Sequence, residues 1–335
     1  MIKVNNILFL FLFVFGLFSC DKTEVTGNDN IIEPEEDNFK MSIEVIGSTK
    51  SSRASVDENL SASGGQLQVR WDEGDKVRMM VGSNPDDVAV CDFSLVGGPS
   101  MGNGNFEYVG KRVETNYYYG IYPPMEVGAN GEVLLNVPVD GTIHQAAADD
   151  SRHLGQFRPM YAPPVQNEDG GNVLKGVMFK HLTSLIIFKV TNSTDETFNL
   201  KSLEMSTVDD KAVFYSSASF NLQKQPEFVT DATPSAYVAM GFDGDGMQIT
   251  SLEMKKAYLP VLPTGDFSSS QLMVKAVTDK GEFIANIPMA ASQKLQSFKA
   301  GNYCIFNLKK TTTGITVGVE IQGWEDGEMV DVPIL

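Results

Sequence analysis

Two short patterns in this chain of 335 residues place polar side chains at spacings that catalysis or metal binding can use. Gly98-Pro-Ser100-Met-Gly102 matches G-x-S-x-G, in which a strand-to-helix turn exposes and activates the serine. No helical pattern follows it here, so we expect a glycine-rich loop between strands. Asp243-Gly-Asp245-Gly246 opens like a calcium loop but lacks the downstream glutamate that binds the ion with two oxygens, so we expect a tight turn.

The histidines and the paired aspartates do not form a catalytic set either. His144, His153 and His181 share no metal-ligand spacing and have no cysteine partners, so we expect hydrogen-bonded structural roles. Three pairs of adjacent aspartates, at 86–87, 149–150 and 209–210, would point to opposite faces of a strand and cannot share a proton. The sequence therefore favours a protein that is not an enzyme and that needs no cofactor and no metal.

Cys20 has the clearest chemical role in the sequence. It follows a positive Lys3 and an apolar run over residues 7–18, which is too short to cross a bilayer core of about 30 Å as a stable helix. The run ends in Leu17-Phe18-Ser19-Cys20, which resembles a bacterial lipobox, where the cysteine thiol takes a diacylglycerol before cleavage makes it the first residue. We predict a signal peptide over residues 1–19 and lipid anchoring to a membrane through Cys20.

Charge and cysteine content exclude further classes. The chain has 26 Lys and Arg against 43 Asp and Glu, a formal net charge of −17, and no basic cluster, which argues against nucleic acid and anionic membranes as partners. Cys91 and Cys304 each lie inside an apolar run, far apart in the sequence, and we expect small buried residues rather than a disulfide. The length beyond residue 19 suits two domains of about 100–200 residues each.

The elements begin after an acidic, polar stretch over residues 21–38 that has too little apolar content to fold alone and reads as a tether. Residues 39–46 alternate, which predicts a half-buried strand with one apolar face, made of Phe39, Met41, Ile43 and Val45. A small polar stretch over residues 47–57 follows and contains one arginine, Arg53. The first strand is therefore expected to hang on a linker that a protease can cut.

Short strand-like runs then recur between clusters of Gly, Asn, Asp and Pro. A first series covers residues 76–81, 89–95, 105–109, 117–122 and 133–137, and a second covers 184–191, 198–205, 257–262, 272–278, 283–287 and 303–308. Only residues 142–148, where Thr142 and Gln145 can form a capping box, have a helical pattern. Strand and helix do not alternate, so we predict an all-β chain of two β-sandwich domains, with a boundary near residue 175 after Pro163-Pro164 and the polar loop 166–171.

The C-terminus carries the pattern of a hairpin. Residues 315–321 alternate cleanly, Trp324 and a turn at 325–327 follow, and residues 330–334 form a second apolar run. Proline cannot donate a hydrogen bond to a ladder, so Pro333 excludes a central position. We expect the final run to be an edge strand or a segment that adds to another sheet.

Six short motifs occur in a fixed order along the chain: Trp71-Asp-Glu-Gly-Asp75, Tyr119-Gly-Ile-Tyr-Pro123, Pro159-Met-Tyr-Ala162, Phe179-Lys-His-Leu182, Tyr258-Leu-Pro-Val-Leu-Pro263 and Ala300-Gly-Asn-Tyr303. Together they resemble the fimbrillin family, the pilin-like subunits of type V pili, over nearly the whole chain. The resemblance implies a lipoprotein with two tandem transthyretin-like β-sandwich domains, here expected at residues 54–175 and 176–335. Residues 20–53 would then be a tether and pro-segment.

The family resemblance also implies a mode of assembly. Trypsin-like cleavage after an arginine removes an N-terminal strand, and Arg53, before Ala54, stands where that arginine is expected. Excision of the strand with Phe39, Met41, Ile43 and Val45 would leave an apolar groove with unpaired backbone groups, to which another strand can add. The best donor is the C-terminal hairpin of a neighbour, through Ile315, Val317, Val319 and Ile321. The alternative is that this hairpin completes its own domain, as in tip or anchor subunits.

Two functions follow from these expectations. The first is a structural and adhesive pilus subunit on the outer membrane and cell surface, with identical or different pilus subunits as partners and a host or bacterial surface molecule as ligand. The second is a surface lipoprotein that binds glycans, with exposed aromatics such as Tyr117, Tyr118 and Trp324 as stacking platforms. An excisable first strand distinguishes them, because a glycan-binding protein has no need of one.

Overall fold

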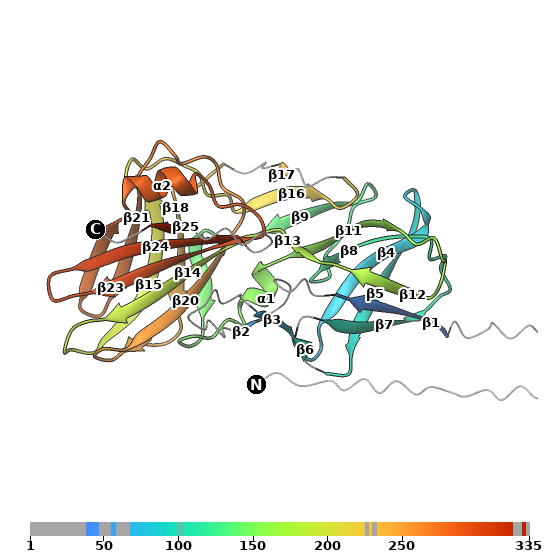
Figure 1. The fold of residues 1–335 in the computed structure, drawn as a ribbon, viewed down its shortest axis with the longest axis horizontal. Helices are drawn as coiled ribbons and strands as arrows, with labels where there is room; N and C mark the ends of the chain where they lie inside the picture. Colours follow the sequence, from blue (N-terminus) through green and yellow to red (C-terminus); the bar gives the residue numbers. More distant parts are fainter. Residues whose placement is uncertain are drawn as a thin grey trace, which may run out of the picture. The chain divides into compact units, whose positions relative to one another are not determined.

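The computed structural model describes residues 38–46, 55–57, 68–98, 100–101, 103–224, 228–229, 233–323 and 330–332. Strands dominate this part of the chain (Figure 1), which confirms the all-β fold class. Its helices are α1 (Leu154–Phe157) and α2 (Met289–Leu295), and no described helix is long and apolar enough to span a membrane. The predictions for Cys20, Arg53, Ala54 and Trp324 concern residues outside the described ranges.

The strands follow one another along the chain with few helical interruptions. The earlier strands are β1 (Phe39–Val45), β2 (Ser55–Asp57), β3 (Gln68–Trp71), β4 (Lys76–Asn84), β5 (Asp87–Val96), β6 (Ser100–Met101), β7 (Gly104–Gly110), β8 (Tyr117–Tyr122), β9 (Glu132–Asn136), β10 (Asp140–Gln145), β11 (Met160–Gln166), β12 (Val173–Val177) and β13 (Lys180–His181). The later strands are β14 (Ser184–Asn192), β15 (Phe198–Thr207), β16 (Ser217–Asn221), β17 (Phe228–Val229), β18 (Tyr237–Phe242), β19 (Met247–Ile249), β20 (Met254–Val261), β21 (Leu272–Thr278), β22 (Gly281–Asn286), β23 (Asn302–Lys310), β24 (Ile315–Gly323) and β25 (Val330–Val332).

An eight-stranded sheet has the order β12-β1-β7-β5-β4-β8-β11-β13. Its two end strands, β12 and β13, are separated in sequence only by Met178 and Phe179, which span at most about 11 Å. In a flat sheet of this width the end strands would lie roughly 34 Å apart. The sheet must therefore curl back on itself, and its inner face encloses a core that includes Trp71, Phe93 and Phe106.

Two further sheets carry the larger core. One contains β10-β18-β15-β21-β22, with β19 paired to β15, and the other is β20-β14-β23-β24-β25. Side chains from both sheets, including Phe188, Leu203 and Phe306, belong to one buried cluster, as expected for two sheets packed face to face. The outer face of β14, β20 and β23 is covered at Tyr258 and Tyr303 by Leu154 of α1.

Residues 140–145 are strand β10, so the helix expected over residues 142–148 is wrong. Ile143 and Gln145 are both fully buried while their neighbours are exposed, which is the alternation of a strand. The Gln145 amide side chain accepts from the Tyr258 N–H at 3.0 Å and donates to the carbonyls of Ala147 and Lys256. These contacts, and pairing with β18, outweigh the local capping signal.

The strands β9 and β10 pair with strands from much later in the chain. A three-stranded sheet, β17-β16-β9, joins β9 to β16, and β10 runs parallel to β18. Residue 175, near the expected domain boundary, lies within β12 of the eight-stranded sheet. Asp37–Leu335 form one compact unit, and the division into two domains stays a prediction.

Strand β1 is an interior strand of the eight-stranded sheet. Met41, Ile43 and Val45 are at most 2% exposed, Phe39 is half-buried, and Lys40 and Glu44 are exposed, which confirms the predicted alternation. Burial of three such side chains contributes about 1.5–3 kcal/mol each. A segment at the start of the described chain is therefore an integral part of this core.

Replacing Ile43 by Ala is expected to lower the free energy of unfolding by about 2–5 kcal/mol, because it removes buried methyl groups and leaves a cavity. The matched control is Lys40→Ala on the exposed face of the same strand, which should change it by less than about 0.5 kcal/mol. Urea denaturation followed by tyrosine and tryptophan fluorescence measures both. Equal effects of the two substitutions would show that β1 is not part of the core in solution.

Candidate assembly site

The slot that holds β1 has two hydrogen-bonding walls. On one side β1 runs antiparallel to β7, in register from Phe39 opposite Gly110 to Val45 opposite Gly104. On the other side it runs parallel to β12, where Ser42 is opposite Val173 and Ile43 is opposite Leu174. Further backbone bonds extend this wall at both ends, from the Ser42 N–H to the Asn172 carbonyl at 2.9 Å and from the Ile46 N–H to the Val177 carbonyl at 3.0 Å.

Among the described residues, β12 has β1 as its only neighbour in the sheet. Removal of β1 would therefore leave unpaired backbone groups on both β7 and β12 and would interrupt the curled sheet between them. Antiparallel and parallel ladders have different hydrogen-bond patterns, so a strand that satisfies both walls must run in the direction of β1. The slot thus specifies the orientation of its occupant.

The floor of the slot is apolar and aromatic. Met41 is the register partner of Tyr108, whose ring lies 5.6 Å from that of Phe93. Cys91 lies in the same cluster, beside Tyr108, and burial raises the pKa of its thiol to about 11. At the first residue of the strand, the Arg112 guanidinium lies over the Phe39 ring, 5.7 Å from its centroid.

The predicted donor residues lie in β24, which pairs with β23 along its whole length, from Asn302 opposite Gly323 to Lys310 opposite Ile315. Val317 and Val319 are 8% and 5% exposed and belong to the large core, and Ile315 packs against it. Ile321 lies in the same strand, but its side chain is outside the described part. In this structure the hairpin completes its own sheet.

β25 is the last strand of that sheet, the edge position that Pro333 predicts. Among the described residues it pairs with β24 alone, from Val319 opposite Val332 to Ile321 opposite Val330. The neighbours of β1 therefore come from distant sequence, whereas β25 pairs with the strand that precedes it. The N-terminal strand is interior, and the C-terminal one is an edge.

Four of the six sequence motifs meet beneath the eight-stranded sheet. The Trp71 ring lies 4.9 Å from Phe106, 5.2 Å from Tyr122 and 6.2 Å from Phe179, edge to face in each case. The Tyr122 hydroxyl donates to Asp75 at 2.9 Å, and the Asp72 N–H donates to the other oxygen of that carboxylate at 2.7 Å. Desolvation and the nearby carboxylate both raise the Tyr122 pKa above its ordinary value.

Arg158, which the sequence did not single out, lies beside the same cluster. It is fully buried, and its guanidinium approaches the His181 ring, with Nη2 3.3 Å from Nε2. Burial lowers the pKa of Arg158 to about 9, and burial together with this arginine lowers the pKa of His181 well below its ordinary value. These groups lie at the junction of β8, β11 and β13, so they hold strands together. The position of Arg158 directly before a motif was the signal available in the sequence.

The other residues with candidate chemistry take structural roles. Ser100 lies on strand β6 opposite Trp71, not on a strand-to-helix turn. The segment from Asp243 is the expected tight turn, closed by a 3.1 Å bond from the Gly246 N–H to the Asp243 carbonyl. His144 Nδ1 lies 3.2 Å from Asp243, and His153 Nε2 lies 2.8 Å from the Tyr258 carbonyl. Within the described ranges, no group of three or more His, Cys, Asp or Glu can hold a metal ion.

Two further predictions are decided by burial. Cys91 and Cys304 are both buried free thiols, in different clusters, as predicted. Tyr117 and Tyr118 are only 6% and 2% exposed, so their expected role as exposed stacking platforms is wrong. The reason is that both faces of β8 are covered, one by the inner core and the other by β9 and β16.

Comparison with known proteins shows that this architecture also occurs in solved structures. No curated protein matches the sequence. Among solved structures, a candidate cell adhesion protein of Bacteroides uniformis matches with a TM-score of 0.56 at 13% identity, over 85% of this chain and 98% of that one. Another from Bacteroides ovatus matches with a TM-score of 0.54 at 13% identity, over 89% of this chain and 99% of that one. At this identity the likeness shows a shared fold.

The sequence itself matches a family model. The match runs over residues 68–324, from β3 through β24, and so includes the slot walls β7 and β12 and the hairpin strand β24. On this match, the chain belongs to the fimbrillin-like family.

Proposed function

We propose that this chain is a structural and adhesive subunit of a cell-surface pilus, exported as a lipoprotein and assembled by removal of β1 and strand exchange. Membership of the fimbrillin-like family supports the role. The observation that carries the mechanism is that β1 is an interior strand with a buried apolar face. The sequence that follows it contains Arg53 in a small polar stretch.

A slot filled by a new strand is more stable than an empty slot between β7 and β12. Loss of Met41, Ile43 and Val45 from the core costs roughly 5–9 kcal/mol before the backbone hydrogen bonds to both walls are counted. A strand with apolar side chains at alternate positions recovers both contributions. An emptied subunit therefore takes up a strand from a neighbour, either an identical or a different pilus subunit.

The donor that we propose is the segment over residues 315–321. Ile315, Val317, Val319 and Ile321 repeat the spacing of the four apolar residues of β1. Because the same segment completes the sheet of its own subunit, donation requires it to leave β23. If it stays, this chain only accepts a strand, as a tip-like or anchor-like subunit would.

Lipid attachment at Cys20 would tether the newly exported chain to the outer membrane before assembly. The polar, acidic residues 21–38 suit a tether, because they lack the apolar content to pack on either sheet. A glycan-binding lipoprotein was the competing function, and burial of Tyr117 and Tyr118 removes two of the three aromatics on which it rested.

Cys20→Ser is expected to abolish metabolic labelling of the protein with palmitate and to release it from membranes, because no other residue of the lipobox can carry the thioether. Membrane fractionation and autoradiography measure both effects. Cys91→Ser, which changes a buried thiol, is the matched control and should label normally. Unchanged labelling of the Cys20→Ser protein would refute the anchor.

Limited trypsin digestion is expected to cut first after Arg53, to give a new N-terminus at Ala54, and to expose Cys91 once β1 leaves. Burial holds the pKa of the Cys91 thiol at about 11 instead of 9.0. Its return toward the ordinary value raises the thiolate fraction at pH 8 by roughly a hundredfold. The experiment uses the Cys20→Ser protein, and gel filtration in mild denaturant separates the cut protein from the released segment. Alkylation of Cys91 is then measured by mass spectrometry.

Two internal controls accompany the digestion. Arg53→Gln protein should stay uncut at this bond and keep Cys91 unreactive. Cys304, whose pKa burial also raises, belongs to the core of the other sheets and should stay unreactive in the cut protein. A first cut elsewhere with the 53–54 bond intact, or protection of Cys91 after the cut, would contradict release of β1.

A disulfide between β23 and β24 is expected to stop donation without unfolding the subunit. Lys309 and Thr316 are exposed register partners, so Lys309→Cys/Thr316→Cys places two thiols about 4.5–5.5 Å apart at Cβ. The oxidised, cut protein should remain monomeric by light scattering, and the same protein after reduction should polymerise.

This disulfide is a better test of the donor than replacing Val317 and Val319 by charged residues. Both valines are buried in their own subunit, so charges there would destabilise the subunit itself. If the oxidised protein polymerises as well as the reduced one, the hairpin is not the donor. If the cut wild-type protein stays monomeric at high concentration, strand exchange between copies of this chain is wrong.

A further inference from the structure

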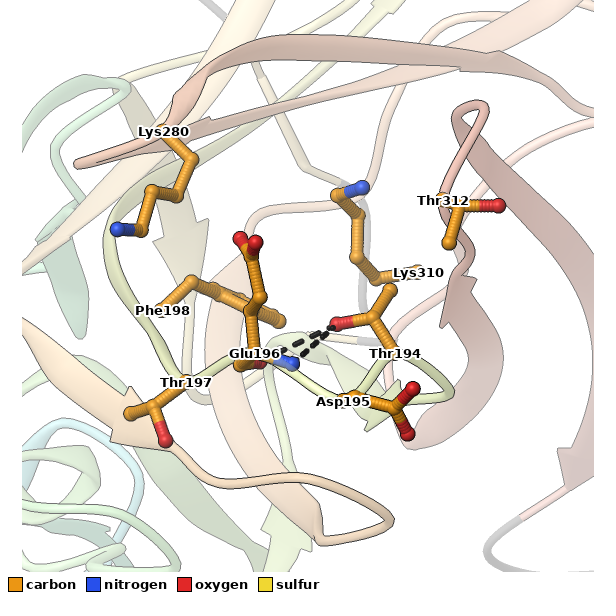
Figure 2. A pocket seen from close by; sticks show the side chains of 8 residues that line it. All are labelled: Thr194, Asp195, Glu196, Thr197, Phe198, Lys280, Lys310 and Thr312. Carbon is orange, nitrogen blue, oxygen red and sulfur yellow. Dashed lines mark hydrogen bonds between the residues drawn. The ribbon is translucent and has the colours of Figure 1, made fainter.

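A cavity of about 360 Å³ opens where the two sheets of the large core meet at one end. Three connections line it: the β14–β15 segment with Asp195 and Glu196, the β21–β22 turn with Lys280, and the β23–β24 turn with Thr312. In Figure 2 the Glu196 side chain lies between Lys280 and Lys310, and the two ammonium groups lie on opposite sides of its carboxylate. The volume is in the range of small-molecule sites in proteins.

Lys310 is the unusual residue of this cavity. It is 8% exposed, and its ammonium lies 4.2 Å from the centroid of the Phe283 ring and donates to the Thr311 carbonyl. Buried lysines are normally paired with carboxylates, but Lys310 has no carboxylate partner among the described residues. The cation–π contact orients the ammonium, and one of its three N–H donors is used on the Thr311 carbonyl.

The opposite wall is held rigid from beneath by Asn192, which is fully buried. Its carboxamide oxygen accepts from the Thr194 N–H at 3.0 Å and from the Thr194 hydroxyl at 2.7 Å. Its amide nitrogen donates to the carbonyls of Glu196 and Ile249 at 2.7 and 3.2 Å. Every hydrogen-bonding position of Asn192 is therefore used to fix the backbone that carries Asp195 and Glu196, so the cavity is formed before any ligand arrives.

The charges indicate the class of ligand. Lys280 and Lys310 provide charged donors on two sides of the cavity, while the exposed carboxylates of Asp195 and Glu196 provide acceptors. A simple anion would be repelled by the two carboxylates, whereas a ligand with one anionic group and several hydroxyls uses both signs. We propose that this cavity binds an acidic sugar residue, with its carboxylate or sulfate on Lys310 and its hydroxyls on Glu196 and Lys280.

This site would give the subunit an adhesion ligand, and it does not depend on strand exchange, because all its residues belong to the later sheets of one chain. The test is titration of the uncut, Cys20→Ser protein, observed by saturation-transfer NMR. Methyl glucuronide should bind with an affinity on the order of millimolar, as expected for its size, and binding should weaken with salt. Methyl glucoside, which has the same ring without the charge, should not bind at these concentrations.

Two further probes define the anion and the need for a sugar. Glucose 6-sulfate distinguishes a sulfate source from a carboxylate source, and binding of either acid supports the site. Acetyl-alanine offers a carboxylate without sugar hydroxyls and should not bind. Equal binding of acetyl-alanine and methyl glucuronide would overturn the sugar assignment in favour of a peptide carboxylate.

Lys280→Met and Lys310→Met should each weaken methyl glucuronide by at least about tenfold, the loss expected for a charge-assisted hydrogen bond. Lys294→Met on α2, an exposed lysine outside the cavity, is the control and should bind normally. Lys280 is exposed, so its variant keeps the test valid if Lys310→Met fails to fold. Unchanged affinity in Lys280→Met, or equal binding of methyl glucoside, would refute the proposal.

Discussion

The backbone pairing of β1 with β7 on one side and β12 on the other is the constraint on which the first part of the fold depends. Because β12 has no other neighbour in the described sheet, β1 alone joins it to the remaining strands. The inner core is closed by a segment that comes from the start of the described chain. One strand therefore closes the inner core.

The C-terminal hairpin differs from β1 in what its contacts contribute. β24 makes a full ladder with β23 and buries Val317 and Val319, so the strand contributes to its own subunit before it can contribute to another. In an exchange, a donated strand loses and regains similar contacts, and the net free energy comes from the emptied slot of the acceptor. In the proposed exchange, the physical driving force for assembly would therefore lie at β1, while the moving strand would be the hairpin.

The motifs that run through the sequence are parts of two packing clusters. Trp71, Tyr122 and Phe179 meet beneath the eight-stranded sheet, while Tyr258 and Tyr303 lie together with Leu154 on the outer face of β14. Both clusters combine aromatic rings with buried hydrogen bonds, which specify strand order more narrowly than apolar contacts do. This explains why residues far apart in the chain form one recognisable pattern without any catalytic geometry.

Local alternation in the sequence determined the all-β class, the buried face of β1 and the edge position of β25, since period-2 patterns and proline act within a single strand. It did not determine which strands pair with one another. Three features depend on which distant strands lie beside a given strand. They are the pairing of β10 with β18, the burial of Tyr117 and Tyr118, and the register shift of β11 between Ala162 and Val165, where its two prolines lie. The cavity at Lys310 arises in the same way, from three connections that lie far apart in the sequence, between β14 and β15, β21 and β22, and β23 and β24. The sequence alone determined which segments are strands and which faces are apolar, whereas only the tertiary structure decided what covers each face, because burial and hydrogen bonding across sheets are set by non-local contacts.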